Sequence, residues 1–189
     1  MKKFVFAYLA TLLLATHVLA DEETASSLCG ADEHQYFSCR VHKSAKIVSL
    51  CGNVDLSESG GSKLFDEQDS AYLQYRFGSP EKIEMIYPKT KQDSFAKFGG
   101  GNIRTYFGAL QEVEFSIGEY RYNVSSSSFA QNDERTDVKE FYGVKVTKGN
   151  SITPKEFLCD TNPFHDARRK RDTWGDFNVI TDQLQDHHQ

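Results

Sequence analysis

The stretch that decides the fold is "YLQYRFGSPEKIEMIYP", from Tyr72 to Pro88. Apolar and aromatic side chains stand at every second position on both sides of Gly78-Ser79-Pro80, a sequence of turn-forming residues. Strict alternation around a turn is typical of a β-hairpin with one face buried. The many rings of this segment are therefore expected to fill a core.

The register of this hairpin follows from matching the two apolar sets. For both sets to share one face, Phe77 must oppose Ile83, which leaves a five-residue loop from Gly78 to Lys82. On the other face Arg76 then lies across from Glu84, a favourable pair of opposite charges.

The same test applied to "QYFSCRVHKSAKIVSLCG", from Gln35 to Gly52, predicts a second hairpin. In that register Cys39 opposes Ser49, and Cys51 lies diagonally away at roughly 7 to 8 Å. That distance is too long for a relaxed disulfide between Cys39 and Cys51.

Two further hairpins are predicted downstream. "QEVEFSIGEYRYNV" turns at Ile117-Gly118, and "EFYGVKVTKGNSITPKEFLC" turns at Lys148-Gly149-Asn150, with Pro154 indicating a last strand that begins late or lies at an edge. Together the hairpins give about eight short strands, so the predicted fold class is all-β, an antiparallel barrel or sandwich.

Polar or glycine-rich stretches between the hairpins are interpreted as loops. They are 57–70, Gly99-Gly100-Gly101 and 125–137. Surface loops of this kind are common places for binding sites.

The first twenty residues have the pattern of a secretory signal. Lys2 and Lys3 precede an apolar run too short to span a bilayer comfortably, and cleavage is expected after Ala20. The chain is therefore expected to be periplasmic or secreted in a bacterium, without stable membrane insertion. Loss of the two lysines takes the formal net charge from −5 to −7, which argues against nucleic acid as a partner.

The four cysteines, Cys29, Cys39, Cys51 and Cys159, all follow the signal. An even number in an exported chain predicts two disulfides, and no close pair of the kind that zinc sites use is present. With Cys39 to Cys51 disfavoured, two schemes stay open. One joins Cys29 to Cys51 and Cys39 to Cys159, and the other joins Cys29 to Cys39 and Cys51 to Cys159.

The predicted organisation is a signal peptide at 1–20, a β-rich domain at 21–160 and a polar tail at 161–189. The tail is expected to be disordered or one loose helix, and Arg168–Arg171 within it is interpreted as a solvated charge run.

Catalytic motifs are weak in this chain. Glu112 and Glu114 could form an acid/base pair, but their alternation with Val113 and Phe115 favours the solvated face of a strand. No nucleophile elbow, cofactor motif or metal-ligand set is found, so the chain is not expected to be an enzyme or to need a cofactor.

The segments "FSC" (37–39), "VSLCG" (48–52), "LQYRFG" (73–78) and "FSIGEYRY" (115–122) resemble a family of small, uncharacterised exported bacterial proteins. This resemblance implies export and a β-rich fold, and it implies no activity.

A second resemblance is to the bacterial inhibitors of chicken-type lysozyme, which are eight-stranded barrels. Their early and late cysteines form a disulfide that corresponds to Cys39 and Cys159. Their Tyr-x-x-x-Thr-Lys-Gly motif resembles Tyr142 followed by Thr147-Lys148-Gly149, here with one more residue between, and "SIGEY" resembles their second loop. The resemblance implies that Lys148 enters an acidic cleft, with Tyr120 and Tyr142 beside it.

The leading hypothesis is an exported, non-catalytic binding protein with a protein partner. Its most concrete form is a lysozyme-inhibitor-like protein. One alternative is an envelope structural or assembly factor that acts through its C-terminal tail. The other is a hydrolase on a β scaffold.

Overall fold

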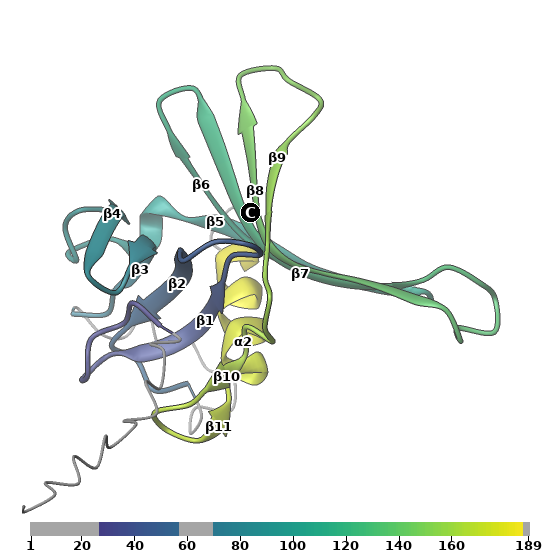
Figure 1. The fold of residues 1–189 in the computed structure, drawn as a ribbon, viewed down its shortest axis with the longest axis horizontal. Helices are drawn as coiled ribbons and strands as arrows, with labels where there is room; N and C mark the ends of the chain where they lie inside the picture. Colours follow the sequence, from purple (N-terminus) through teal and green to yellow (C-terminus); the bar gives the residue numbers. More distant parts are fainter. Residues whose placement is uncertain (1–26, 57–69, 187–189) are drawn as a thin grey trace, which may run out of the picture.

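The computed structural model describes residues 27–56 and 70–186. Residues 1–26, which include the predicted signal peptide, the polar stretch 57–69 and residues 187–189 lie outside the described residues. The described residues form an all-β, antiparallel fold, as predicted, with a four-stranded and a five-stranded sheet and one short helix (Figure 1). A third, two-stranded ribbon lies near the C-terminus.

Both large sheets are meanders in which sequential strands are neighbours. The first contains β1 (His34–Arg40), β2 (Ile47–Gly52), β3 (Leu73–Ser79) and β4 (Lys82–Tyr87). A 3-10 turn, η1 (Phe95–Lys97), leads into the second, which contains β5 (Gly99–Thr105), β6 (Gly108–Ile117), β7 (Tyr120–Ala130), β8 (Val138–Lys148) and β9 (Lys155–Leu158). As Pro154 indicated, β9 begins late and is an edge strand of its ladder.

The two sheets meet where β1 ends and β9 ends. The His42 amide donates to the Leu158 carbonyl at 2.7 Å, and the Asp160 amide donates to the Arg40 carbonyl at 2.8 Å. Together with an isolated antiparallel bridge between Val41 and Cys159, these hydrogen bonds connect the two sheets at this junction.

Aromatic rings join the concave faces of the two sheets. Phe115 of β6 stacks on Tyr87 of β4 at 4.5 Å and on Tyr122 of β7 at 4.8 Å. Tyr75 of β3 lies 4.9 Å from the same ring. The rings of 72–88 thus fill a core, as their alternation predicted.

The predicted register of the 72–88 hairpin is wrong, and its buried face is correct except at Ile83, which opposes Gly78 and is exposed. Phe77 opposes Met85 rather than Ile83, and Ser79 pairs with Lys82, so the five-residue loop is replaced by a two-residue turn. The register shifts at Gly78, where a Cβ would lie 2.3 Å from the Lys82 carbonyl oxygen. The glycine permits this bulge, which alternation alone does not reveal.

The expected charge pair across this hairpin is also absent from the described contacts. Arg76 opposes Ile86 and forms its ion pair with Glu33, while Glu84 pairs with Lys46 at 2.7 Å.

The first hairpin is offset by one residue from the predicted register. Cys39 opposes Val48, not Ser49, and a bulge lies between Gln35 and Phe37. Because side chains alternate, Cys39 and Cys51 lie on opposite faces of the sheet. The prediction that no disulfide joins Cys39 to Cys51 is correct. The reason is that the two cysteines lie on opposite faces, not that they are too far apart on one face.

The first of the two disulfide schemes is confirmed. Cys29 is joined to Cys51 and Cys39 to Cys159, with Cα–Cα distances of 5.4 and 5.5 Å. The second bridge ties β1 to the end of β9, at the junction between the sheets.

Two predicted loops belong wholly or partly to strands instead, while 131–137 connects β7 to β8 as a loop, as predicted. Gly99–Gly101 begins β5, where a Cβ on Gly100 would lie 2.4 Å from the Glu112 carbonyl oxygen. The serine run Ser125–Ser128 lies inside β7, paired with β6 on one side and β8 on the other. Ladder pairing, with β6 for the glycines and on both sides for the serines, overrides the weak strand preference of these residues.

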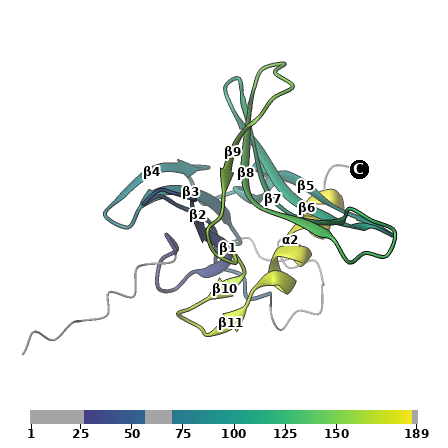
Figure 2. The ribbon, with the colours of Figure 1, turned by 45° about the vertical axis from the view of Figure 1, so that its right-hand side comes forward.

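After Cys159, the chain forms one of the two predicted alternatives, a single helix, α2 (Trp174–Asp186). It follows a ribbon of β10 (His165–Asp166) and β11 (Arg171–Asp172) and lies against β1 and β5 (Figure 2). Phe177, Ile180 and Leu184 are completely buried. The helix is thus part of the core, a contact that the polar composition of the tail did not indicate.

The arginines before the helix are not a solvated run. Arg168 donates to the Cys29 and Gly30 carbonyls at 3.0 and 2.8 Å, and Arg169 donates to the Glu33 carbonyl at 2.7 Å. They fasten the C-terminal segment to the first described residues.

No helix in the described part of the chain has the length and apolar character needed to cross a membrane.

Deleting the ring of Phe177 should test whether α2 belongs to the core. Phe177→Ala is expected to lower the free energy of unfolding by about 3 to 5 kcal/mol, since it leaves a cavity among Phe37 and Phe164. Ile152→Ala, at a side chain that is 97% exposed, should change it by less than about 0.5 kcal/mol. Urea unfolding measures both, and equal values would contradict a packed helix.

Candidate functional site

The most heavily bonded carboxylate in the described chain, Glu33, is structural. Arg76 donates to both of its oxygens at 2.6 and 2.7 Å, and the Gly30 amide donates at 2.6 Å. Tyr72 and Lys91 add bonds of 2.7 and 3.1 Å. A carboxylate with this many donors has no free lone pair for a substrate.

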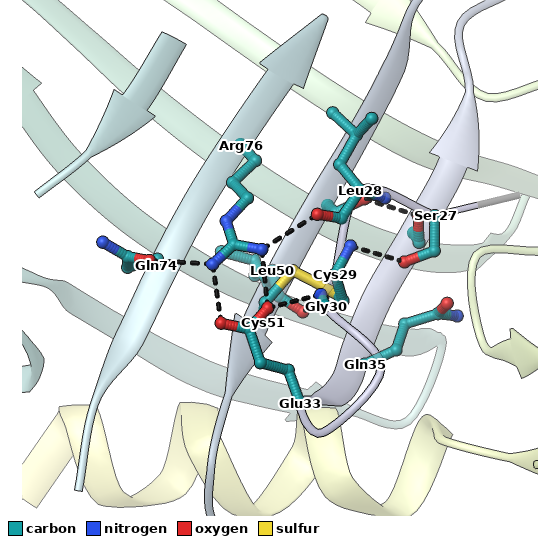
Figure 3. Close-up of a disulfide and its surroundings, with 12 residues drawn as sticks. Ser27, Leu28, Cys29, Gly30, Glu33, Gln35, Leu50, Cys51, Gln74 and Arg76 are labelled. Atoms are coloured by element: carbon teal, nitrogen blue, oxygen red, sulfur yellow. Dashed lines mark hydrogen bonds and ion pairs between the residues drawn. A yellow bond between two sulfur atoms is a disulfide. The ribbon is translucent and has the colours of Figure 1, made fainter. Parts of the chain in front are cut away.

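This cluster holds the segment before β1 against the outer face of the first sheet. Figure 3 shows Arg76 reaching from β3 to Glu33 and to the Leu28 carbonyl, beside the Cys29–Cys51 disulfide. Burial alone would raise the pKa of Glu33, but the bond from Arg76 and those from the other donors outweigh it and hold the pKa at about 2.

The residues predicted as a partner site fall into two places. Tyr120 and Lys148 oppose each other across β7 and β8, and the Lys148 ammonium lies 5.6 Å from the Tyr120 ring centre and 3.4 Å from Glu119. Tyr142 lies six residues back along β8, where its ring contacts Phe164 at 6.0 Å. The structure brings Tyr120 and Lys148 together and leaves Tyr142 at the core.

We call the end of the second sheet that carries Tyr120 and Lys148 the Lys148 tip. It consists of the β6–β7 turn and the β8–β9 loop, which project upward in Figure 1. Ile117 and Ile152 are exposed here as well.

The opposite ends of the same strands form a second projection, which we call the arm. It consists of the β5–β6 turn and the β7–β8 hairpin, and it extends to the right in Figure 1. Tyr106 is 70% and Phe107 44% exposed, with Ile103 and Val138 exposed nearby. Arg135 lies over the Tyr106 ring at 5.0 Å, and the surface between them contains a hollow of about 440 Å³.

Sequence reasoning missed the arm. A usable signal was "TYFG" at 105–108, where two adjacent aromatic residues stand in a turn. Turns run over the protein surface, so two aromatic rings in a turn are expected to be exposed.

Glu112 and Glu114 lie on the outer face of β6, as the alternation with Val113 and Phe115 predicted, but they are half-buried rather than fully solvated. The Asn123 amide donates to one oxygen of each, at 3.3 and 3.5 Å. Burial, and then repulsion by Glu114, raise the pKa of Glu112. Such a pair can attract a cation or, with Glu112 protonated, exchange a proton.

No family model, curated protein or solved structure matches the chain. Among the residues that the structure describes, no group of three or more His, Cys, Asp or Glu side chains is placed to hold a metal ion.

The Glu33 cluster predicts a pH dependence of stability. The folded-state pKa of about 2 lies below the ordinary value of 4.5, so the stabilisation is fully present above pH 4.5 and is lost as the pH falls towards 2. Glu33→Gln should cost about 3 kcal/mol at pH 7, and this difference from wild type should shrink between pH 5 and pH 2.

Urea unfolding at a series of pH values measures the effect, with the exposed Glu134→Gln as a control that should follow the wild-type curve. A constant difference between Glu33→Gln and wild type at all pH values would contradict the assignment.

Proposed function

We propose that the chain is an exported, non-catalytic binding protein of the bacterial envelope that holds a protein partner through projecting turns. The observation that carries this proposal is the arm, where Tyr106, Phe107 and Ile103 are exposed together at the end of paired strands. Exposed apolar groups gathered in one place mark interaction surfaces. Tyrosine and arginine, here stacked as Tyr106 and Arg135, are the residue types that most often dominate binding energy.

The strands that carry the arm also supply the core, which favours a rigid binding surface. Val113, Val124 and Val144 are buried where β6, β7 and β8 cross the core. A surface held by such strands loses little conformational entropy when it binds. Export is supported by the two disulfides, which form and persist in oxidising compartments.

A lysozyme-inhibitor-like role is the most concrete form of the proposal. Lys148 lies at a projecting turn with its side chain more than half exposed, as such a role requires. Its ion pair with Glu119 brings a carboxylate into the same tip, which weakens the attraction to an acidic cleft. The arm has no comparable conflict and is the preferred contact surface.

The alternative in which the C-terminal tail carries the interaction has less support. Since α2 contributes Phe177, Ile180 and Leu184 to the core, little of it is free to reach a partner. For the same reason, truncation after Cys159 would disturb the fold and would not separate the two hypotheses.

Peptidoglycan lysis by chicken-type, goose-type and invertebrate-type lysozymes, with and without excess oxidised protein, tests the concrete form. We expect one enzyme to be inhibited, and the double variant Tyr106→Ala, Phe107→Ala to weaken inhibition about 30-fold, as for loss of a binding hot spot. Ile83→Ala, an exposed apolar residue of β4, should have little effect. Loss on Lys148→Ala instead would place the site at the Lys148 tip, and no inhibition by wild type would contradict the inhibitor role.

Binding through the arm is tested separately by photocrosslinking in the bacterial envelope. A photoreactive phenylalanine analogue at position 106 should give a discrete protein adduct, whereas the same analogue at position 83 should not. Absence of an adduct from position 106 would contradict the arm as the contact surface.

A further inference from the structure

A second feature of the five-stranded sheet, which shares Ile103 with the arm, is a hollow on its outer face beside edge strand β5. It has a volume of about 270 Å³ and is lined by side chains and backbone of Gly101, Ile103, Leu110, Glu112 and Glu114, with Gln185 at its rim. We call it the acidic hollow. Ligand pockets for small molecules usually exceed about 300 Å³, so this hollow suits a single side chain.

Glycines of β5 leave the hollow open. Gly101 opposes Glu112 and Gly99 opposes Glu114 across the β5–β6 ladder. A Cβ on Gly101 would meet only the Gln185 side chain, at 3.7 Å. Neither glycine can place a side chain over the carboxylates, so both remain reachable from the β5 edge.

Ser125, which lies on β7 next to Glu112 and outside the lining of the hollow, is a second and independent observation. It opposes Glu112 on the other side, across β6 and β7, so both side chains emerge on the outer face. Ser125 is only 2% exposed, and its hydroxyl has no hydrogen-bond partner. A buried hydroxyl without a partner costs about 1 to 3 kcal/mol, so such groups are uncommon in folded proteins.

The carboxylates are only partly compensated by the protein itself. Their hydrogen-bond donor, Asn123, serves both at distances near the upper limit for a hydrogen bond. The charge of Lys145 partly offsets the raised pKa of Glu112, but Lys145 is shared, since it also forms an ion pair with Glu156 at 3.7 Å and lies over the Phe141 ring. Glu112 and Glu114 therefore face the hollow as a negative pair with unused acceptor capacity.

We propose that the acidic hollow binds an arginine side chain of a partner protein, with the guanidinium between Glu112 and Glu114. The planar guanidinium presents five donors and bonds carboxylates in pairs, which suits two carboxylates on one strand face. Its aliphatic stem lies along Ile103 and Leu110, which line the same hollow. The Ser125 hydroxyl is then an additional acceptor beside Glu112.

A divalent metal ion is a poorer fit for this hollow. Calcium takes six to eight oxygen ligands, and only two carboxylates converge here among the described residues. The formal net charge of −5 also matches a basic protein better than a free cation.

The test is a titration of the isotopically labelled oxidised protein, followed by amide chemical shifts. The probe is N-acetyl-arginine amide, and its matched control is the uncharged N-acetyl-citrulline amide. We expect saturable shifts at Gly101, Asn123 and Ser125 with the arginine probe and none with citrulline. In its presence the pKa of Glu112 should fall, since a nearby cation favours the ionised form.

Glu112→Gln and Glu114→Gln should each weaken the arginine probe at least 10-fold, whereas Glu119→Gln at the Lys148 tip should not. The dispersion of the amide spectrum reports whether each variant is folded. Saturable shifts with calcium chloride but not with arginine would overturn the proposal in favour of a metal site. Absence of saturable shifts with the arginine probe would also overturn it.

The outcome is independent of the proposed function of the arm. The double variant Tyr106→Ala, Phe107→Ala should bind the arginine probe as wild type does, because neither residue lines the acidic hollow. Absence of a crosslink from position 106 would therefore contradict only the arm, and absence of saturable shifts with the arginine probe would contradict only the acidic hollow.

Discussion

The contact that the rest of the structure depends on is the aromatic stack around Phe115. This ring lies between Tyr87 of one sheet and Tyr122 of the other, with Tyr75 and Phe98 against its edges. Aromatic pairs in such geometries contribute about 0.5 to 1.5 kcal/mol each beyond the burial of their area. The stack fixes the two sheets face to face and sets the level at which β6 and β7 cross the core.

The projections follow from this arrangement. β6, β7 and β8 have 10 or 11 residues each, and their buried valines occupy the middle of the strands. Their two ends therefore extend beyond the core in opposite directions along the strands, one as the Lys148 tip and the other as the arm. The pairing that orders these ends is the same ladder that builds the core, so the candidate surfaces are held by backbone hydrogen bonds.

The sequence predicted correctly which face of most strands is buried, but it did not predict how neighbouring strands pair residue by residue. Alternation placed Tyr75, Phe77, Val113 and Phe115 on buried or half-buried faces because side-chain direction has a period of two along any strand. The exact pairing depended on bulges, one at Gly78 and one between Gln35 and Phe37, and these arise from tertiary fit. In the tail, Phe177, Ile180 and Leu184 have helical spacing, so the buried face of α2 could have been inferred from the sequence.

The candidate site was predictable only in part. Tyr120 was expected beside Lys148 and opposes it across β7 and β8, but the exposure of Tyr106 and Phe107 depends on how far the arm extends beyond the core. The hollow required the register of three strands, which brings Gly101, Glu112 and Ser125 into one row. Rows that cross strands are a property of pairing, and the linear sequence does not contain them.

The surroundings of two carboxylates, Glu33 and Glu112, explain why one has a structural role and the other is a candidate for binding. Glu33 and Glu112 both lose water on folding, and for each of them burial raises the pKa. At Glu33 the donors outweigh burial, so the charge is satisfied within the chain and stabilises it. At Glu112 burial and a second carboxylate outweigh the Asn123 amide and the Lys145 charge, so the fold leaves the carboxylate only partly compensated. A group in the second situation gains most from a cation supplied by another molecule, which is why the acidic hollow and not the Glu33 cluster is the place for a partner's arginine.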